Sequence, residues 1–468
     1  MPETKHFIQV ILPLHLEWEP WYYADRPLEI GEIVEVNIGR RTSLAVVSSA
    51  GKVPDVDESR ILPVSSVPDG YPRILENQIA LWRFIAEYYL CTVGDVFKSA
   101  YPAGRFEVEE RKSVKRISVR HAGSIQPELY DEKPQKPLLV KGCNRTRFYE
   151  PYIQRALSSG KDVLLLHPCA KGESFATLRE LSRAVQTDQP SLLEGSKSLL
   201  FLPFTKLGLV IVDDEHSAKY KHNQSPRYNG RDVAVALASI NGAQTILGSL
   251  TPSLETVFNV RTGKYLMKEL PISSAASVTL IDTDREKRKN GMVGERSRIL
   301  LSAIDSEKDA KVLEIEARDL RSVLDTKKIE RYGIVAVFNF DYLLSRNDFR
   351  SDEKALQMLE ELRCRCNGKL FIQTNNSAHR VLSCEYSRLA DLLLAERKEF
   401  NLPPFTRMVE IRKPSYRDAS KQISGPVSFG RQEIVARHFL ERDKTLQERK
   451  FQIRKETLPG LVIDVDPL

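Results

Sequence analysis

The chain is short of cysteine and of long apolar runs, and each shortage argues against a class of protein. Its six cysteines are scattered over the sequence without the CxxC spacing that tetrahedral zinc sites favour, so we expect no metal site and no zinc. No apolar run approaches the ~20 residues that cross a bilayer. The first twenty residues contain no apolar stretch followed by a small-residue cleavage site. We therefore expect a cytoplasmic protein without a membrane partner.

Length and charge leave room for several domains and for a polyanionic partner. At 468 residues the chain exceeds what one hydrophobic core organises, which favours about two to four domains. The net charge of +7 permits a nucleic-acid partner without demanding one. Residues 1–110 carry 10 Lys and Arg against 17 Asp and Glu, whereas residues 111–150 carry 10 against 4. An acidic amino-terminal region is thus followed by a basic segment.

The front of the chain is typical of a small β-rich module. Alternating apolar residues predict strands over 7–12, 32–37 and 43–47, separated by turn residues. Residues 74–90 have helical apolar spacing, and the charged, proline-ended stretch 105–137 is typical of a linker.

After residue 137 the pattern changes to buried apolar runs that alternate with amphipathic stretches. Such runs are typical of parallel sheets covered on both faces by helices, so we predict an α/β fold. The predicted strands are 138–140, 163–166, 207–212 and 245–247, then 333–338 and 369–373 on either side of a helix over 352–364.

The strand 207–212 ends in three carboxylates and a histidine: Asp213, Asp214, Glu215 and His216. Carboxylates at the carboxyl end of a parallel strand can hold Mg²⁺ beside a nucleotide phosphate and orient the attacking water. An acidic strand end is also common as an ordinary solvated turn, so this pattern alone leaves both interpretations open.

The residues that follow carry a resemblance to a known family. Residues 213–221, 226–234 and 247–256 are similar, in order and spacing, to the DEEH box, the PRY-x-x-RD segment and the GSATPSLE motif of the PriA family (primosomal protein N-prime, the replication restart helicases). Further similar segments are 196–204, 348–353, 371–374, 396–405 and 463–467, and residues 87–102 resemble the family's amino-terminal module that binds DNA 3′ ends.

The resemblance implies a shortened member of this family with two RecA-like helicase lobes. It predicts a β-rich DNA 3′-end-binding domain over 1–105, a linker over 106–137, the first lobe over 138–270 and a degenerate second lobe over 271–395. This second lobe lacks the family's eight-cysteine zinc insert. A mixed carboxy-terminal domain is predicted over 396–468.

The family's phosphate loop is degenerate in this chain. Its glycines let backbone N–H groups surround the phosphates while its lysine reaches the β and γ groups. Here Gly142, Asn144, Arg145 and Thr146 align with it, and Arg145 replaces the lysine. Arginine does not substitute for lysine in a tight phosphate site. We therefore expect no cofactor, with ATP and Mg²⁺ as the ligands if the family's activity survives.

Other catalytic positions also depart from the family. Asp214, one methylene shorter, stands where the family has its catalytic glutamate, and small displacements are costly in catalysis. In the second lobe Arg365 aligns with one family arginine and the other is lost. Such arginines stabilise the charge of the transferring phosphoryl group, so helicase activity is expected to be lost.

Two short segments align with the family's pocket for a DNA 3′ end: Trp21, Tyr22 and Tyr23, and Gly39, Arg40 and Arg41. Aromatic faces stack on unpaired bases and arginines meet phosphates. The alternative is a set of core aromatics and a basic turn. The basic residues in 111–121 could likewise follow a phosphate backbone or simply solvate a linker.

Three functions remain open at this point. The first is a replication restart protein that binds forked or branched DNA with a 3′ end and recruits primosome or single-strand-binding proteins without unwinding. The second is an active 3′-to-5′ ATP-dependent helicase, and the third is a protein scaffold built on inactive ATPase lobes. Through the family, DNA replication, repair and recombination are the implied processes.

Overall fold

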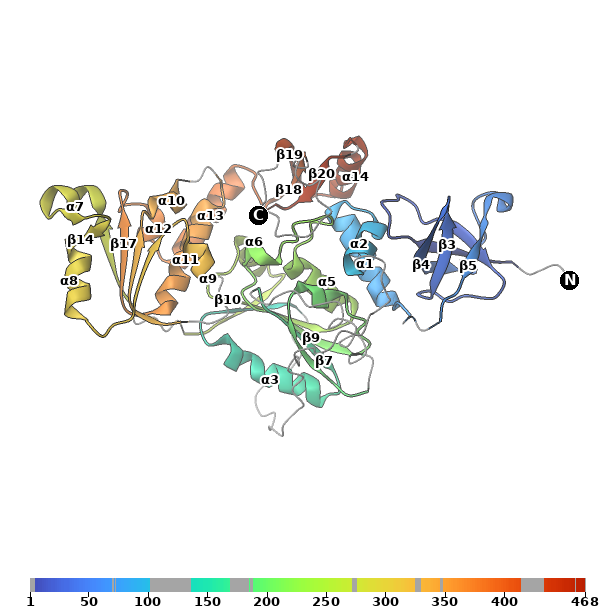
Figure 1. Ribbon diagram of the computed structural model, residues 1–468, viewed down its shortest axis with the longest axis horizontal. Coiled ribbons are helices and arrows are strands. Elements are labelled where there is room, and N and C mark those ends of the chain that lie inside the picture. Colours follow the sequence, from blue (N-terminus) through green and yellow to red (C-terminus); the bar gives the residue numbers. More distant parts are fainter. Residues whose placement is uncertain are drawn as a thin grey trace.

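The units of the chain follow one another along its long axis (Figure 1). An amino-terminal barrel lies at one end, a six-stranded sheet in the middle and a four-stranded sheet at the other end, with a small carboxy-terminal sheet beside the middle unit. The computed structural model describes residues 5–69, 71, 73–101, 136–168, 185, 188–271, 276–324, 330–345, 348–413, 433–458 and 460–467. The expected linker, apart from residues 136 and 137, and its basic run lie outside these residues.

The amino-terminal unit is a closed five-stranded barrel in the order β1-β2-β5-β3-β4. Its strands are β1 (His6–Ile11), β2 (Trp21–Ala24), β3 (Ile33–Ile38), β4 (Arg41–Ala50) and β5 (Leu62–Ser66). Alternate apolar residues such as Val10, Val34 and Val36 are fully buried in the barrel, as the strand period of two requires. The three predicted strands are confirmed, and β2 and β5 complete the barrel.

Two helices join the barrel to the middle unit: α1 (Glu76–Tyr89) and α2 (Val93–Ala100). Trp82 and Ile85 of α1 are fully buried, and Trp82 stacks on Phe97 of α2 with ring centroids 5.3 Å apart. The Asn77 side chain donates to the backbone oxygen of Phe204 at 2.8 Å. The predicted helix is therefore confirmed, and it ties the barrel to the middle sheet.

The middle unit is a parallel sheet in the order β11-β6-β10-β9-β7-β8. Its strands are β6 (Leu138–Lys141), β7 (Asp162–Leu166), β8 (Leu192–Gly195), β9 (Leu207–Val212), β10 (Gln244–Ser249) and β11 (Leu266–Glu269). Helix α3 (Arg145–Ser158) lies on one side of the sheet and α5 (Gly230–Ile240) on the other, with α6 (Leu254–Arg261) after β10 (Figure 1). The four strands predicted here are confirmed.

The third unit is a second parallel sheet, in the order β12-β17-β16-β15. Its strands are β12 (Ser277–Asp282), β15 (Val312–Glu316), β16 (Tyr332–Phe338) and β17 (Cys366–Thr374), with a hairpin of β13 (Met292–Val293) and β14 (Arg296–Ser297). Its helices are α7 (Thr283–Lys289), α8 (Arg298–Ser306), α9 (Leu320–Leu324), α10 (Asp341–Leu344), α11 (Ser351–Arg365), α12 (Arg380–Ser383) and α13 (Tyr386–Glu399).

The carboxy-terminal unit packs back onto the middle of the chain. It is an antiparallel sheet in the order β19-β18-β20 with one helix, built from β18 (Thr406–Arg412), β19 (Ile434–Glu441), α14 (Leu446–Glu456) and β20 (Val462–Val465). Lys221 of the middle unit lies 2.8 Å from the Asp464 carboxylate and donates to the backbone oxygen of Val465 at 2.6 Å. The ammonium of Lys450 donates to the Tyr88 backbone oxygen of α1 at 2.7 Å.

The predicted fold class is confirmed: two helix-covered parallel sheets, a small β-rich amino-terminal domain and a mixed carboxy-terminal one. The domain boundaries proposed from the sequence stay a prediction. Among the helices that the structure describes, none combines the length and the apolar character that a membrane span needs.

Buried ion pairs join the two parallel sheets. Arg350, which precedes α11, contacts the Glu255 carboxylate of α6 at 2.6 Å, and Arg397 of α13 contacts the Glu353 carboxylate at 2.6 Å. The other Glu353 oxygen accepts the backbone N–H of Leu254 at 2.9 Å. Burial opposes the charge on Glu255, but Arg350 and then Arg397 outweigh it and lower the pKa of that carboxyl. These charges are paired with one another, as burial requires.

We predict that Arg397→Leu lowers the free energy of unfolding by about 3 kcal/mol, because it leaves the buried Glu353 carboxylate without its charged partner. The urea midpoint of the intact chain measures this loss. Lys311→Ala is the matched control: it breaks an exposed pair with Glu330, and the midpoint is expected to stay unchanged. Equal midpoints for wild type and Arg397→Leu would contradict a stabilising role for the buried network.

Candidate functional site

The residues expected to bind a nucleotide meet at the carboxyl edge of the middle sheet. Strands β6, β10 and β9 are neighbours and parallel, so the segments that follow them lie together. Gly142 follows β6, Asp213 and Asp214 follow β9, and Ser249 ends β10. The structure therefore brings together the degenerate phosphate loop and the acidic strand end.

The Arg145 side chain occupies the space between these segments. Its Nε donates to Asp213 Oδ1 at 2.7 Å, its Nη2 to Asp214 Oδ1 at 2.6 Å and its Nη1 to the Gly142 backbone oxygen at 2.8 Å. The Tyr149 hydroxyl, one helical turn further along α3, donates to the same Asp213 oxygen at 2.7 Å. A guanidinium thus stands where a divalent cation would be held by these carboxylates.

The charges in this cluster depend on one another. Burial opposes the charge of Arg145, but Asp213 and Asp214 outweigh it and raise the pKa of the guanidinium. Burial likewise opposes the charge of Asp213, yet contact with Arg145 keeps the pKa of that carboxyl below its usual value. For Asp214, burial and the neighbouring Asp213 charge raise the pKa. The guanidinium of Arg145 therefore compensates the charge of this acidic pair.

The turn after β6 does not fit a phosphate. The Gly142 N–H donates to the Ser249 backbone oxygen at 3.0 Å, so it is not directed at a ligand. The turn contains three residues before α3 begins at Arg145, and Thr146 is exposed on the first turn of the helix. Phosphate loops work by directing successive free N–H groups at the ligand. The residues present therefore do not fit ATP with Mg²⁺.

Gly248 in β10 explains the close approach of Tyr149. A Cβ built on Gly248 would lie 1.7 Å from the Tyr149 hydroxyl and 2.8 Å from Asp213 Oδ1. Only glycine leaves room for this hydrogen bond. Sequence reasoning did not select Tyr149, although its position four residues after Arg145 places both on one face of a helix.

The other two residues of the acidic box have partners of their own. Glu215 is buried, pairs with Arg231 at 3.1 Å and accepts the backbone N–H of Ser253 at 2.7 Å. His216 Nδ1 lies 2.7 Å from Ser249 Oγ. Both side chains therefore connect the acidic box to β10 and to the start of α6.

The second sheet does not direct its aligned arginine at this cluster. Arg365 is buried, and its Nη2 donates to the Leu324 backbone oxygen and to the Glu361 carboxylate, each at 2.6 Å. Within the described residues, no group of three or more His, Cys, Asp or Glu side chains could hold a metal ion. The expected lack of zinc stays a prediction.

The aromatic residues selected at the front lie on β2 of the barrel. Tyr22 is buried and its hydroxyl donates to the Asn37 backbone oxygen at 3.0 Å, which ties β2 to the end of β3. The Trp21 indole N–H donates to the Asp55 carboxylate at 2.6 Å, and Lys5 lies 4.5 Å from the ring centre of Tyr23. Tyr22 is thus a core residue, whereas Trp21 and Tyr23 are half-buried.

The basic turn lies close to this aromatic strand. Gly39, with φ of +61°, makes the turn between β3 and β4, two residues after Asn37. Arg40 and Arg41 are exposed at this turn and form no ion pair with another described residue. The contact of Tyr22 with Asn37 therefore brings the aromatic strand to the end of β3 that leads into the basic turn.

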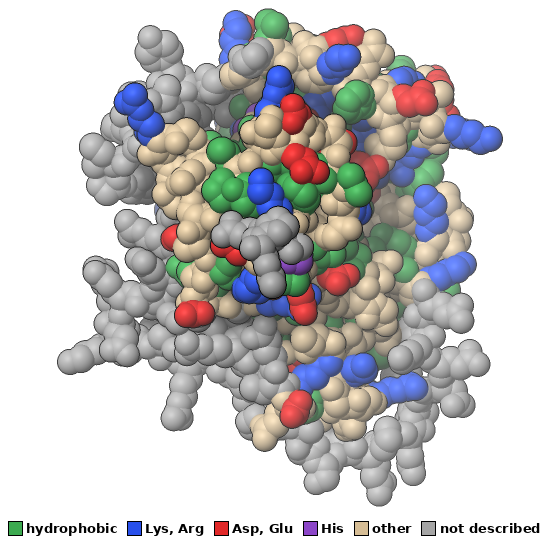
Figure 2. All heavy atoms as spheres, turned by 90° about the vertical axis from the view of Figure 1, so that its right-hand side faces the viewer, with side chains coloured by type: hydrophobic (Ala, Val, Ile, Leu, Met, Phe, Trp, Pro, Cys, Tyr) green, Lys and Arg blue, Asp and Glu red, His purple; other side chains and the backbone are tan. Residues whose placement is uncertain are grey.

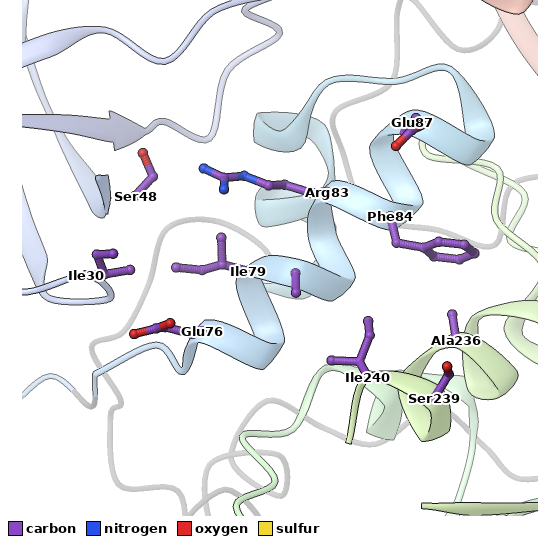
Figure 3. Close-up of a pocket in the computed structure, with 11 residues that line it drawn as sticks. Ile30, Ser48, Glu76, Ile79, Arg83, Phe84, Glu87, Ala236, Ser239 and Ile240 are labelled. Carbon is purple, nitrogen blue, oxygen red and sulfur yellow. The ribbon is translucent and has the colours of Figure 1, made fainter. Parts of the chain in front are cut away.

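The face at the barrel end is not broadly basic. Figure 2 shows Lys and Arg side chains interspersed with Asp, Glu and hydrophobic ones among the described residues in view. A groove of about 590 Å³ lies between the barrel, α1 and α5, where Arg83 extends toward Ser48 and Phe84 toward Ala236 (Figure 3). Glu76 and Glu87 also line it, which makes it a poor site for a phosphate.

Parts of the chain are similar to known proteins. Residues 9–102 match the family described as PriA 3′ DNA-binding domain (3′BD). The replication restart protein PriA of Rickettsia felis is 27% identical over 327 residues, which are 61% of this chain and 49% of that protein. The Haemophilus influenzae PriA protein is 33% identical over 179 residues, 33% of this chain and 24% of that one. This chain spans about half the length of the curated relatives it matches.

Similarity to solved structures is partial. A chain described as RecG bound to a three-way DNA junction gives a TM-score of 0.28 at 12% identity, covering 55% of this chain and 40% of that one.

We predict that Arg145→Ala creates a divalent-cation site, because it frees the adjacent Asp213 and Asp214 carboxylates for a hard cation. Mn²⁺ titration followed by electron paramagnetic resonance should show saturable binding to the variant and none to the wild type. Arg147→Ala, an exposed arginine on the same turn of α3, is the matched control and should behave as wild type. Mn²⁺ binding of equal strength to wild type and Arg145→Ala would show that the guanidinium does not occupy the cation position.

Proposed function

We propose that the chain acts as a PriA-like replication restart protein, as its similarity to the PriA 3′ DNA-binding domain and to PriA proteins supports, and that it binds forked or branched DNA with a 3′ end without unwinding it. The observation that supports the absence of unwinding is the contact of Arg145 with the Asp213 and Asp214 carboxylates. A motor of this type needs a cation and a nucleotide between its lobes. Here the cation position is filled by a side chain.

The barrel is the proposed contact with DNA. Arg40 and Arg41 are exposed and could contact the phosphates at the end of a DNA strand, and the half-buried Trp21 and Tyr23 on β2 of the same barrel could stack on unpaired bases. The family matched by residues 9–102 is described as a 3′ DNA-binding domain, which supports this assignment. Because the basic side chains are few, the contact suits an end or a junction better than a long duplex tract.

The remaining parts of the proposal follow from the family. Primosome or single-strand-binding proteins are the expected protein partners. ATP hydrolysis is not expected. In this proposal Asp213, Asp214, Glu215 and His216 have a structural role at the carboxyl edge of the middle sheet. DNA binding is therefore expected to need neither ATP nor Mg²⁺.

We predict that Arg40→Ala with Arg41→Ala weakens binding to a forked DNA with a free 3′ end by about tenfold, because two phosphate contacts are lost. The slope of log affinity against log salt should fall by roughly 1.4 to 1.8 units for the same reason. Fluorescence anisotropy of labelled forks over a salt series measures both. Arg26→Ala is the matched control: Arg26 lies on the same barrel but is paired with Glu32 at 2.9 Å, so its loss should leave the affinity unchanged.

A second arm tests the preference for a 3′ end. The same fork carrying a 3′-phosphate in place of the 3′-hydroxyl should bind the wild type more weakly and should be affected less by the arginine substitutions. If the double variant binds as tightly as wild type, the barrel turn is not the DNA contact. If the wild type binds no fork at low salt, the chain is a protein scaffold.

A further inference from the structure

Two thiols from different sheets face each other beside the Arg145 cluster. Cys143 lies in the turn between β6 and α3, and Cys364 lies in the last turn of α11. They are 221 residues apart in the chain, yet their sulfur atoms are 3.3 Å apart, and both residues are half-buried. A disulfide needs about 2.05 Å, so the sulfurs have only about 1.3 Å further to approach.

From this geometry we propose that Cys143 and Cys364 are a redox-sensitive pair that forms a reversible disulfide between the two parallel sheets. The bond would join the turn between β6 and α3, at the carboxyl edge of the middle sheet, to helix α11 of the second sheet. It would fix the relative position of the two sheets, which in the reduced protein depends on the ion pairs around Glu255 and Glu353. This proposal does not depend on DNA binding.

The surroundings assign a role to each sulfur. The hydrogen bond with Cys143, and then burial, raise the pKa of Cys364, which therefore keeps its proton and can donate it to the Cys143 sulfur. Cys143 is thus the attacking sulfur and Cys364 the resolving one.

The oxidation balances with a peroxide as the oxidant. The Cys143 thiolate attacks one peroxide oxygen, the O–O bond breaks, and hydroxide leaves to give a Cys143 sulfenic acid. The Cys364 sulfur then attacks the Cys143 sulfur, the S–S bond forms, the S–O bond breaks, and water leaves with the Cys364 proton. Two thiols are oxidised and one peroxide is reduced to two waters. A dithiol reductant reverses the step by exchange.

Two of the other cysteines within the described residues lack this geometry. Cys91 and Cys366 are buried, and their sulfurs lie 3.9 Å from the backbone oxygens of Ile85 and Gly333. Burial raises the pKa of the Cys91 thiol and that of the Cys366 thiol, so neither forms a thiolate readily.

The test is peptide mapping of the intact, folded chain after treatment with hydrogen peroxide. Free thiols are alkylated in denaturant and the protein is cut with trypsin, which cleaves after Arg363 and after Arg365 and so separates Cys364 from Cys366. We expect a cross-linked pair of peptides containing Cys143 and Cys364 in most molecules, at a peroxide dose that leaves Cys91 fully alkylated. Dithiothreitol should restore both free thiols.

Variants assign the two roles. Cys366→Ser is the matched control and should form the same cross-link. Cys364→Ser should abolish it and leave a Cys143 sulfenic acid that dimedone traps, whereas Cys143→Ser should give no trapped product at Cys364. Wild-type protein whose Cys143 and Cys364 peptides stay fully alkylated after peroxide, or whose Cys364 links to any other cysteine, would overturn the proposal without reference to any variant.

Discussion

The ion pairs of the partly buried Glu255 carboxylate are the interaction on which the arrangement of the two sheets depends. Glu255 lies on the first turn of a helix of the middle sheet and pairs with Arg350, while Arg397 and Glu353 complete the contact from the second unit. Buried charges are stable only when paired, so separating the sheets would expose or isolate all of them. Three of the segments that resemble family motifs, 247–256, 348–353 and 396–405, therefore supply the ion pairs that link the two sheets.

The same physical constraint explains the edge of the middle sheet. Asp213 and Asp214 are adjacent carboxylates in a partly buried site, where like charges raise the cost of ionisation unless a cation is present. Arg145 supplies that cation from within the chain. Its planar fork reaches two carboxylates at once, which a lysine could not do in the same way. Arg145, at the position aligned with the family's lysine, thus forms an internal ion pair with the acidic strand end.

Much of the fold could be predicted from the sequence, and much of the pairing could not. Apolar runs such as 163–166 and 207–212 predicted strands of a parallel sheet, and the acidic residues after 207–212 were predicted to lie at the carboxyl end of a strand. The inward turn of Arg145 and the Lys221–Asp464 contact had no local signal, because side-chain pairing across long separations follows from tertiary packing. Strand β5, with Pro63 inside it, lacked the usual strand pattern.

Binding of a forked DNA with a free 3′ end, titrated with and without ATP and Mg²⁺ at one salt concentration, tests most directly whether DNA recognition is separate from nucleotide chemistry. Because Arg145 occupies the cation position, the dissociation constant should be the same in both titrations and the fork should remain paired. An affinity that changes with ATP, or strand separation that requires it, would contradict this account and would show that the cleft still binds and uses a nucleotide.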